Sequence, residues 1–529
     1  MTKVVYKFYN QNDSLLFPPC LGDLIPENHQ VRIVSAIIDR LDISSIEQGY
    51  KGGGTSSYNP RMLLKIIVYA YLCNIYSGRQ MEKMLSENIH FMWLSGMSYP
   101  DFRTINLFRS NRLKGVFEDI FTQVVSLLAE EGLVSLNIQY IDGTKIESVA
   151  NKYTFVWRGS VEKNKVKLEE KIKDVLKEAE EALLEESTTP TTEITPEQAK
   201  QKAERILSKM DEKGISNKKL RKEVEKVKDE MAPRLEKYET QLETMGDRNS
   251  YSKTDEEATF MRMKEDAMNN GQTKPGYNVQ IATENQFITN YGLFCRPSDY
   301  ATLIPFLESF KDKFGKQSEE VVADSGYGNE QNYQYMQEED IDAYVKYNMF
   351  HAEQKRKRKS NPFLVQNMFY NKQGDFYVCP MGQHLTFLKY KNAKSELGFE
   401  SIKSLYVSKN CKGCPLRGMC HNSANDYRTI EVNHANDSYR EQARDRLNSE
   451  RGLFHRSMRP IEPEAVFGHI KFNHGFRRFK LKSIAKVTVE FGLVALAHNL
   501  RKYIANNAKK ATNTAISDAN NSQYTSNAA

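Results

Sequence analysis

The sequence predicts an α/β fold in which a mixed β-sheet is flanked by helices, with an all-α region ahead of it. Apolar residues recur at helical spacing through the first 130 residues. A first strand-like run lies just before Asp142, and strand-like runs resume near Gly276 and pass into alternating helix and strand patterns up to Tyr347. A strand-rich start followed by such an alternation is typical of a mixed sheet covered by helices.

Length, charge and hydropathy narrow the class of protein. The chain has 529 residues, more than one hydrophobic core usually organises, so we expect two or more domains. Its net charge of +7 permits a polyanionic partner. The most apolar run, residues 62–76, contains Lys65 and is too short to span a bilayer. We therefore expect a soluble cytoplasmic protein with no membrane partner.

Residues 1–130 are predicted to form a helical N-terminal domain. Asn59 followed by Pro60 is a typical helix start, and another helix is expected from Phe102. This second helix carries Arg103 and Arg109 among apolar neighbours. Two interpretations stay open. Either these arginines contact DNA, or they are solvated side chains of an ordinary helical subdomain.

Two aspartates are expected at strand ends. Asp142 follows a strand-like run and stands before Gly143, which together predict a turn. Asp324 ends the apolar run EVVAD, directly before a Ser-Gly pair. Carboxylates at strand ends are held rigidly yet remain open to solvent, as a metal site requires. Each aspartate alone also fits a simple turn, and the pair favours a site.

A helical arm is predicted over residues 158–250. Apolar residues recur there at heptad-like steps, and Thr195-Pro196 resembles a second helix start. We interpret the arm as a solvated helical element without chemistry of its own, which could still contact DNA or a second subunit.

Residues 276–347 carry the remaining predicted strands and helices. Two β-rich runs flank Glu284-Asn285 as in a hairpin. We then expect a helix over 301–314, a strand over 320–323, a helix over 329–338 and a strand over 343–347.

Residues 350–455 form a predicted insertion with four cysteines. Cys379, Cys411, Cys414 and Cys420 include one C-x-x-C pair, which suits a closed, structural zinc site. Cys379 has no second cysteine close to it, unlike the pair Cys411 and Cys414, so His384 and His421 are alternative ligands. Four reduced cysteines without metal are the alternative.

A third carboxylate is expected on a helix opened by Pro463. On that helix Glu464, Phe467, Gly468 and Lys471 fall on one face, so that an acid and a base lie together. Glu462 and Glu490 are alternatives to Glu464. Two aspartates and one glutamate suit two Mg²⁺ ions about 3.5 to 4 Å apart, and Lys471 could neutralise a DNA phosphate beside them.

A basic stretch follows this helix. Arg477, Arg478 and Lys480 alternate with Phe476 and Phe479, as if one edge met phosphate while the other packed on the core. DNA contact and a solvated face are the two interpretations. The chain ends in residues 506–529, whose Asn, Ala, Ser and Thr content predicts a disordered tail.

Taken in order, the segments IDGTKIES, ADSGYG, and IEPEAVFGHIK followed by GFRRF resemble the DDE transposases of bacterial insertion sequences that have a helical domain ahead of the catalytic core. The resemblance covers nearly the whole chain. It implies an RNase H-like core in residues 131–505, interrupted by the arm and the insertion. Asp142 would lie on the first strand, Asp324 at the end of the fourth, and Glu464 and Lys471 on a late helix.

The resemblance also implies a function. Such an enzyme uses two Mg²⁺ ions, or Mn²⁺, to cleave the ends of an insertion sequence and to join them to target DNA. Its partners would be double-stranded DNA, at terminal inverted repeats and at the target, and a second copy of the chain in a nucleoid-associated synaptic complex. The alternatives are an RNase H-like nuclease that cuts without joining, and an inert, transposase-derived DNA-binding protein.

Overall fold

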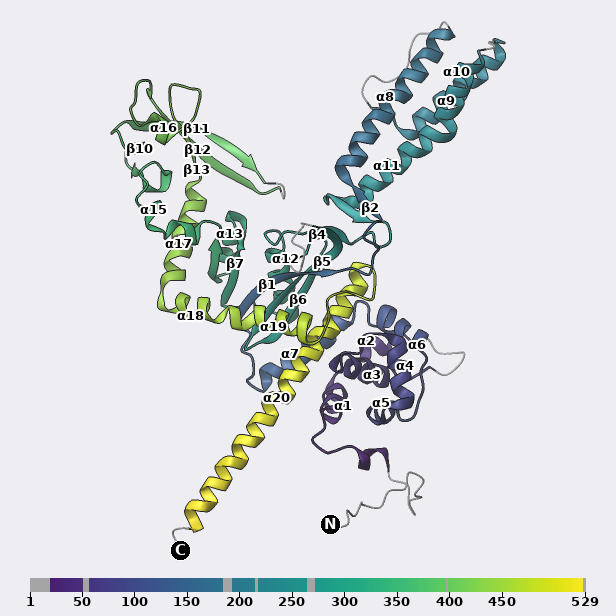
Figure 1. Cartoon of the computed structure of the whole chain (residues 1–529), viewed down its shortest axis with the longest axis vertical. Coiled ribbons are helices and arrows are strands. Elements are labelled where there is room, and N and C mark those ends of the chain that lie inside the picture. Colours follow the sequence, from purple (N-terminus) through teal and green to yellow (C-terminus); the bar gives the residue numbers. More distant parts are fainter. Residues whose placement is uncertain are drawn as a thin grey trace, which may run out of the picture. The chain divides into compact units, whose positions relative to one another are not determined.

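The computed structural model describes residues 20–50, 57–183, 193–214, 217–263, 272–395 and 398–526 (Figure 1). Residues 1–19 of the predicted N-terminal domain lie outside this part. The chain divides into two compact units, one of residues Met1–Leu133 with Val489–Ala529 and one of residues Val134–Thr488. None of the described helices is both long and apolar enough to cross a membrane.

The first unit is built from helices, as predicted for this region. Asn59 caps one of them by accepting a hydrogen bond from the Met62 amide at 3.1 Å, with Pro60 as its first residue. The helices of this unit are α1 (Gln30–Arg40), α2 (Ser44–Glu47), α3 (Pro60–Leu72), α4 (Gly78–Glu87), α5 (Ile89–Ser95), α6 (Phe102–Leu107), α7 (Phe117–Glu130) and most of α20 (Ile484–Ser526).

The structure assigns a helix to most of the segment whose composition predicts a disordered tail. Helix α20 runs without interruption to Ser526. Residues 506–526 contain neither Gly nor Pro, the two strongest helix breakers, so a helix that is already nucleated can continue through them. The segment from Val489 also groups with the N-terminal unit rather than with the core to which residues up to 505 had been assigned.

The second unit contains the predicted mixed sheet (Figure 1). Its strand order is β4-β5-β1-β7-β8, with β6 paired to β5. Strand β1 is antiparallel to β5 and parallel to β7, and β7 is parallel to β8. This arrangement is consistent with an RNase H-like fold. The strands are β1 (Ile138–Glu147), β4 (Thr259–Arg262), β5 (Thr273–Glu284), β6 (Phe287–Phe294), β7 (Glu320–Gly328) and β8 (Asp342–Tyr347).

The local patterns predicted beside this sheet are confirmed. Asn285 and Gln286 join β5 to β6 with φ values of 52° and 61°, as a two-residue hairpin turn requires. Helices α12 (Leu303–Phe314) and α13 (Glu330–Glu338) match the two predicted helices. Together with α17 (His434–Asn448) they contribute side chains to one apolar cluster with β1, β7 and β8.

The turn predicted at Asp142-Gly143 is wrong, because β1 continues through both residues to Glu147. Gly143 pairs with Gln280 on β5. A Cβ atom at Gly143 would lie 2.9 Å from a carboxylate oxygen of Asp299 and closer still to the Gln280 amide. A larger residue here would force the side chains of Gln280 and Asp299 to move, so Gly143 serves close packing across the sheet and not a turn.

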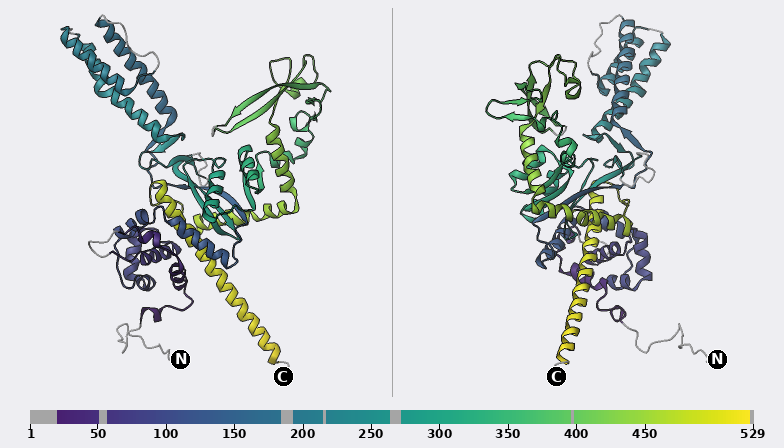
Figure 2. Two further views of the ribbon diagram at one scale, coloured as in Figure 1. Left: turned by 180° about the vertical axis from the view of Figure 1, so that it is seen from behind. Right: turned by 60° about the vertical axis from the view of Figure 1, so that its left-hand side comes forward.

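The predicted helical arm is present. Strands β2 (Phe155–Trp157) and β3 (Ser250–Ser252) pair at its two ends, and its helices lie side by side in both views of Figure 2. The helices are α8 (Arg158–Ala182), α9 (Pro196–Glu212), α10 (Lys218–Lys226) and α11 (Ala232–Met245). They share an apolar core of their own that includes Ile172, Leu176, Ile206 and Val224, which explains the heptad-like pattern.

The insertion after β8 forms a separate antiparallel sheet in the order β13-β12-β11-β10-β9. Its elements are α14 (Phe350–Glu353), α15 (Arg356–Lys359), β9 (Phe369–Asn371), β10 (Phe376–Val378), β11 (His384–Lys394), β12 (Glu400–Ser408), α16 (Arg417–Cys420) and β13 (Thr429–Val432). A small apolar cluster around Tyr377, Leu385 and Tyr406 supports the sheet.

Candidate active site

Asp142 and Asp324 lie on neighbouring parallel strands at the same level. The ladder between β1 and β7 pairs Tyr140 with Val322, and each aspartate follows its member of that pair by two residues. Because side chains two residues apart on a strand share a face, both carboxylates point to the same side of the sheet. The sheet register thus brings these two predicted residues together.

Glu464 reaches the same place from a helical segment that begins well before Pro463. Ser449 caps α18 (Glu450–Met458), and the segment continues through a π-type turn at Pro460–Glu464, α19 (Ala465–Gly468) and a second π-type turn at His469–Asn473. Pro463 lies inside this segment, so the predicted helix start at Pro463 is wrong.

One open pocket of about 290 Å³ contains the predicted residues in its lining. The face predicted for the late helix is confirmed, because all four of its members line this pocket with the two aspartates. The lining residues are Asp142, Thr144, Asp324, Arg459, Glu464, Phe467, Gly468, Lys471 and Phe472.

Arg459 also lines this pocket and was not predicted from the sequence. Its guanidinium lies 3.4 Å from Asp142 Oδ1, 3.3 Å from Asp324 Oδ1 and 3.8 Å from Glu464 Oε1. The Arg459 side chain is only 8% exposed. Residues five apart do not share a face of a regular α-helix, but a π-type turn with i to i+5 hydrogen bonds brings them into line. The Pro-rich sequence gave no indication of that turn.

The electrostatics of the pocket favour the ionised form of Asp324. Burial opposes the charge of Asp324, but Arg459, the Ser325 amide and Lys346 outweigh it and hold the pKa of Asp324 below its ordinary value. Lys346 on β8 is another residue that the sequence did not reveal. Burial, reinforced by the charge of Arg459, lowers the pKa of Lys346.

Lys471 is buried at the edge of the pocket. Its ammonium donates hydrogen bonds to Thr144 Oγ1 at 2.6 Å and to the Lys145 carbonyl at 3.1 Å. Lys471 is 4% exposed, so in this structure it ties the helical segment to β1 rather than standing open to a phosphate.

The two alternative glutamates lie elsewhere. Glu462 is 2% exposed and accepts a hydrogen bond from the Gln286 amide at 2.8 Å, which directs its carboxylate to the β5–β6 turn. Glu490 is fully buried and belongs to the other unit. Of the three candidates, Glu464 is the one that lines the pocket.

The basic stretch has the predicted alternation. Arg477, Arg478 and Lys480 are exposed, whereas Phe476 and Phe479 are buried. Arg478 also donates to the Ser148 carbonyl at 3.0 Å, which fixes the stretch to the end of β1. Its outer edge is exposed.

The two predicted DNA-contacting arginines of the first unit differ in their exposure to solvent. Arg103 is exposed and lies over the Phe102 ring. Arg109 is 3% exposed and donates hydrogen bonds to Tyr71 Oη at 3.0 Å and to the Tyr76 carbonyl at 2.8 Å. The prediction that Arg109 contacts DNA is wrong, because its buried guanidinium is hydrogen-bonded inside the helical unit.

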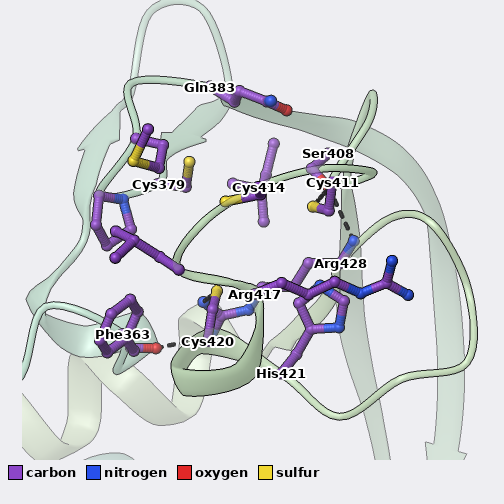
Figure 3. A pocket seen from close by; sticks show the side chains of 14 residues that line it. Phe363, Cys379, Gln383, Ser408, Cys411, Cys414, Arg417, Cys420, His421 and Arg428 are labelled. Carbon is purple, nitrogen blue, oxygen red and sulfur yellow. Dashed lines mark hydrogen bonds between the residues drawn. The ribbon is translucent and has the colours of Figure 1, made fainter.

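The four cysteines of the insertion line one small cavity of about 20 Å³ (Figure 3). Cys411 Sγ lies 3.1 Å from Ser408 Oγ, and Arg428 donates to Cys420 Sγ at 3.0 Å. His421 also lines this cavity, whereas His384 stacks on Phe376 and does not line it. Within the described ranges, no three His, Cys, Asp or Glu side chains are arranged so that they could hold a metal ion as they stand.

Three models of known protein families match parts of the chain. Residues 19–111 match a transposase domain, and residues 249–381 and 378–504 match two models of a transposase DDE domain. No curated protein matches the chain. The chain therefore belongs to the DDE transposases. More narrowly, the helical transposase domain ahead of the DDE matches makes it a transposase of the insertion-sequence type.

Proposed function

We propose that this chain cleaves DNA at the ends of an insertion sequence and transfers the freed ends into target DNA, with Asp142, Asp324 and Glu464 as its catalytic carboxylates. One observation carries the proposal. These three side chains, widely separated in sequence, line a single open pocket together with Lys471.

The donor set suits a hard divalent cation. Carboxylate oxygens in a site open to solvent leave room for water and phosphate, as Mg²⁺ and Mn²⁺ prefer. A pair of such ions would supply charge stabilisation to the entering and leaving oxygens of the phosphodiester. The chain's part is to hold Asp142 and Asp324 on rigid strands and Glu464 on the late helical segment, while Lys346 adds positive charge near Asp324.

We further propose that two copies of the chain bring two terminal inverted repeats together and that the exposed residues Arg477, Arg478 and Lys480 contact DNA phosphates. These residues form one outward edge whose inner side packs on the core. Exposed Arg103 is the matching candidate in the helical unit.

The test is a cleavage and joining assay. The full-length protein is incubated with Mg²⁺, duplexes that carry the element's own ends, and a target plasmid. The proposal expects both nicked ends and joined products. Cleavage without joining would favour a simple nuclease, and binding without cleavage in either Mg²⁺ or Mn²⁺ would favour an inert DNA-binding protein.

A second proposal concerns the insertion. We propose that Cys379, Cys411, Cys414 and Cys420 hold a structural zinc ion. The thiols line one cavity, and Gly382 and Gly413, with φ of 79° and 74°, make the tight turns beside Cys379 and Cys414. Zinc would draw the four thiolates to about 2.3 Å from one centre.

A further inference from the structure

Arg459 is the group that all three carboxylates of the pocket share. Its two terminal nitrogens divide the contacts, since Nη2 faces Asp142 and Nη1 faces both Asp324 and Glu464, all between 3.3 and 3.8 Å. A cation that bridges three acids at these distances stands where an ion held by the same three acids would have to lie.

Because Arg459 is buried between the three carboxylates, the loss of its positive charge from this position would be energetically unfavourable. The side chain is 8% exposed, and its Nε is a buried nitrogen without a hydrogen-bond partner in the described part of the chain. A guanidinium is tolerated at such a place because the acids compensate its charge. Conversely, without a cation the three carboxylates would repel each other across the pocket.

We propose that Arg459 is a gate for the divalent metal, namely an internal cation that offsets part of the charge of the three carboxylates in the DNA-free enzyme and must move before they can bind an ion. This inference rests on the proposed carboxylate site. It also gives a physical reason why the acids contact a common guanidinium rather than converging on a point of their own.

The gate makes Arg459 and the metal competitors for one set of ligands. Removing the guanidinium should therefore strengthen metal binding, whereas removing a nearby arginine that does not bridge the acids should change it little. Arg456 is that matched control. It lies on the same helix, and its guanidinium stacks over Phe350 and reaches the Leu447 carbonyl.

The experiment measures binding of Mn²⁺ alone to the full-length protein without DNA, by calorimetry and by the electron paramagnetic resonance of free Mn²⁺. Couplings between two sites commonly change affinity by about 5- to 150-fold, so we expect Arg459→Gln to bind Mn²⁺ at least about tenfold more tightly than the wild type. Arg456→Gln should stay within about threefold. Arg459→Lys, which keeps the charge but loses the bridging fork, should fall between wild type and Arg459→Gln.

The outcomes distinguish a failure of the gate from a failure of the carboxylate site. If Arg459→Gln and Arg459→Lys both fold and bind Mn²⁺ no more tightly than the wild type, Arg459 is no gate. If Asp142→Asn and Asp324→Asn bind Mn²⁺ as well as the wild type, the carboxylate site itself is wrong. Should Arg459→Gln fail to fold, the rise in melting temperature with Mn²⁺ for Arg459→Lys decides, and a rise no larger than that of the wild type overturns the gate.

Discussion

Asp142 and Asp324 stand side by side because β1 and β7 are parallel and in register, each aspartate lying two residues beyond the pair Tyr140 and Val322. Their spacing is therefore set by backbone hydrogen bonds and not by flexible side chains. Glu464 has no such constraint from the sheet, since it comes from a helical segment with π-type turns.

The first prediction concerns the aspartates. Asp142→Asn and Asp324→Asn should each abolish strand cleavage while DNA binding stays within about threefold, because the amide keeps the shape but loses the charge that holds Mg²⁺. Cleavage of labelled end duplexes and a gel-shift titration measure the two effects. Asp340→Asn is the control, since Asp340 is exposed with a φ of 55° that Asn tolerates. Near-normal cleavage by either site variant would remove that residue from the site.

The second prediction separates the three glutamates. Glu464→Gln should be as inactive as the aspartate variants. Glu462→Gln should keep most activity, because its amide oxygen still accepts the Gln286 hydrogen bond. Glu490→Gln, fully buried in the other unit, should lower the melting temperature but cleave DNA below it. An active Glu464→Gln beside a dead Glu490→Gln that remains folded would contradict the assignment.

Local patterns predicted the strands and helices of residues 276–347, because alternation and turn residues there agree with the tertiary fold. They failed where contacts between residues far apart in the sequence determine the local structure. Asp142-Gly143 has turn chemistry, yet pairing with Gln280 on β5 keeps it in a strand. Arg459 escaped notice because helical spacing assumes regular turns, and a π-type turn moves it onto the face of Glu464. Composition favoured a disordered tail from Asn506, although helix α20 extends to Ser526.

The third prediction contrasts Arg103 with Arg109. Arg109→Ala should lower the free energy of unfolding by about 3–5 kcal/mol, since it removes a buried charge and leaves the Tyr76 carbonyl and the Tyr71 hydroxyl without their donor. Arg103→Ala should leave stability within about 0.5 kcal/mol. Urea denaturation measures both. Equal stability of the two variants would show that the Arg109 network contributes nothing.

The fourth prediction concerns zinc. Gently purified protein should contain about one zinc per chain, and Cys414→Ser should lose it and lower the melting temperature. Elemental analysis and thermal unfolding measure these effects. Cys295→Ser, which changes a cysteine outside the cavity, should keep its zinc. Wild-type protein without zinc, but with four titratable thiols in the insertion, would instead support the reduced-cysteine alternative.

The last prediction tests what Lys471 does. The sequence suggested a phosphate contact, but the buried ammonium bonds to Thr144 and to the Lys145 carbonyl. Lys471→Met should therefore lower the free energy of unfolding by about 1–3 kcal/mol, because it leaves these buried acceptors unpaired. The salt dependence of DNA binding should stay unchanged. Lys480→Met, at an exposed position, should do the reverse, keeping stability while the slope of log K against log salt falls by about 0.9. If Lys471→Met is stable and reduces that slope instead, Lys471 must leave β1 when DNA binds.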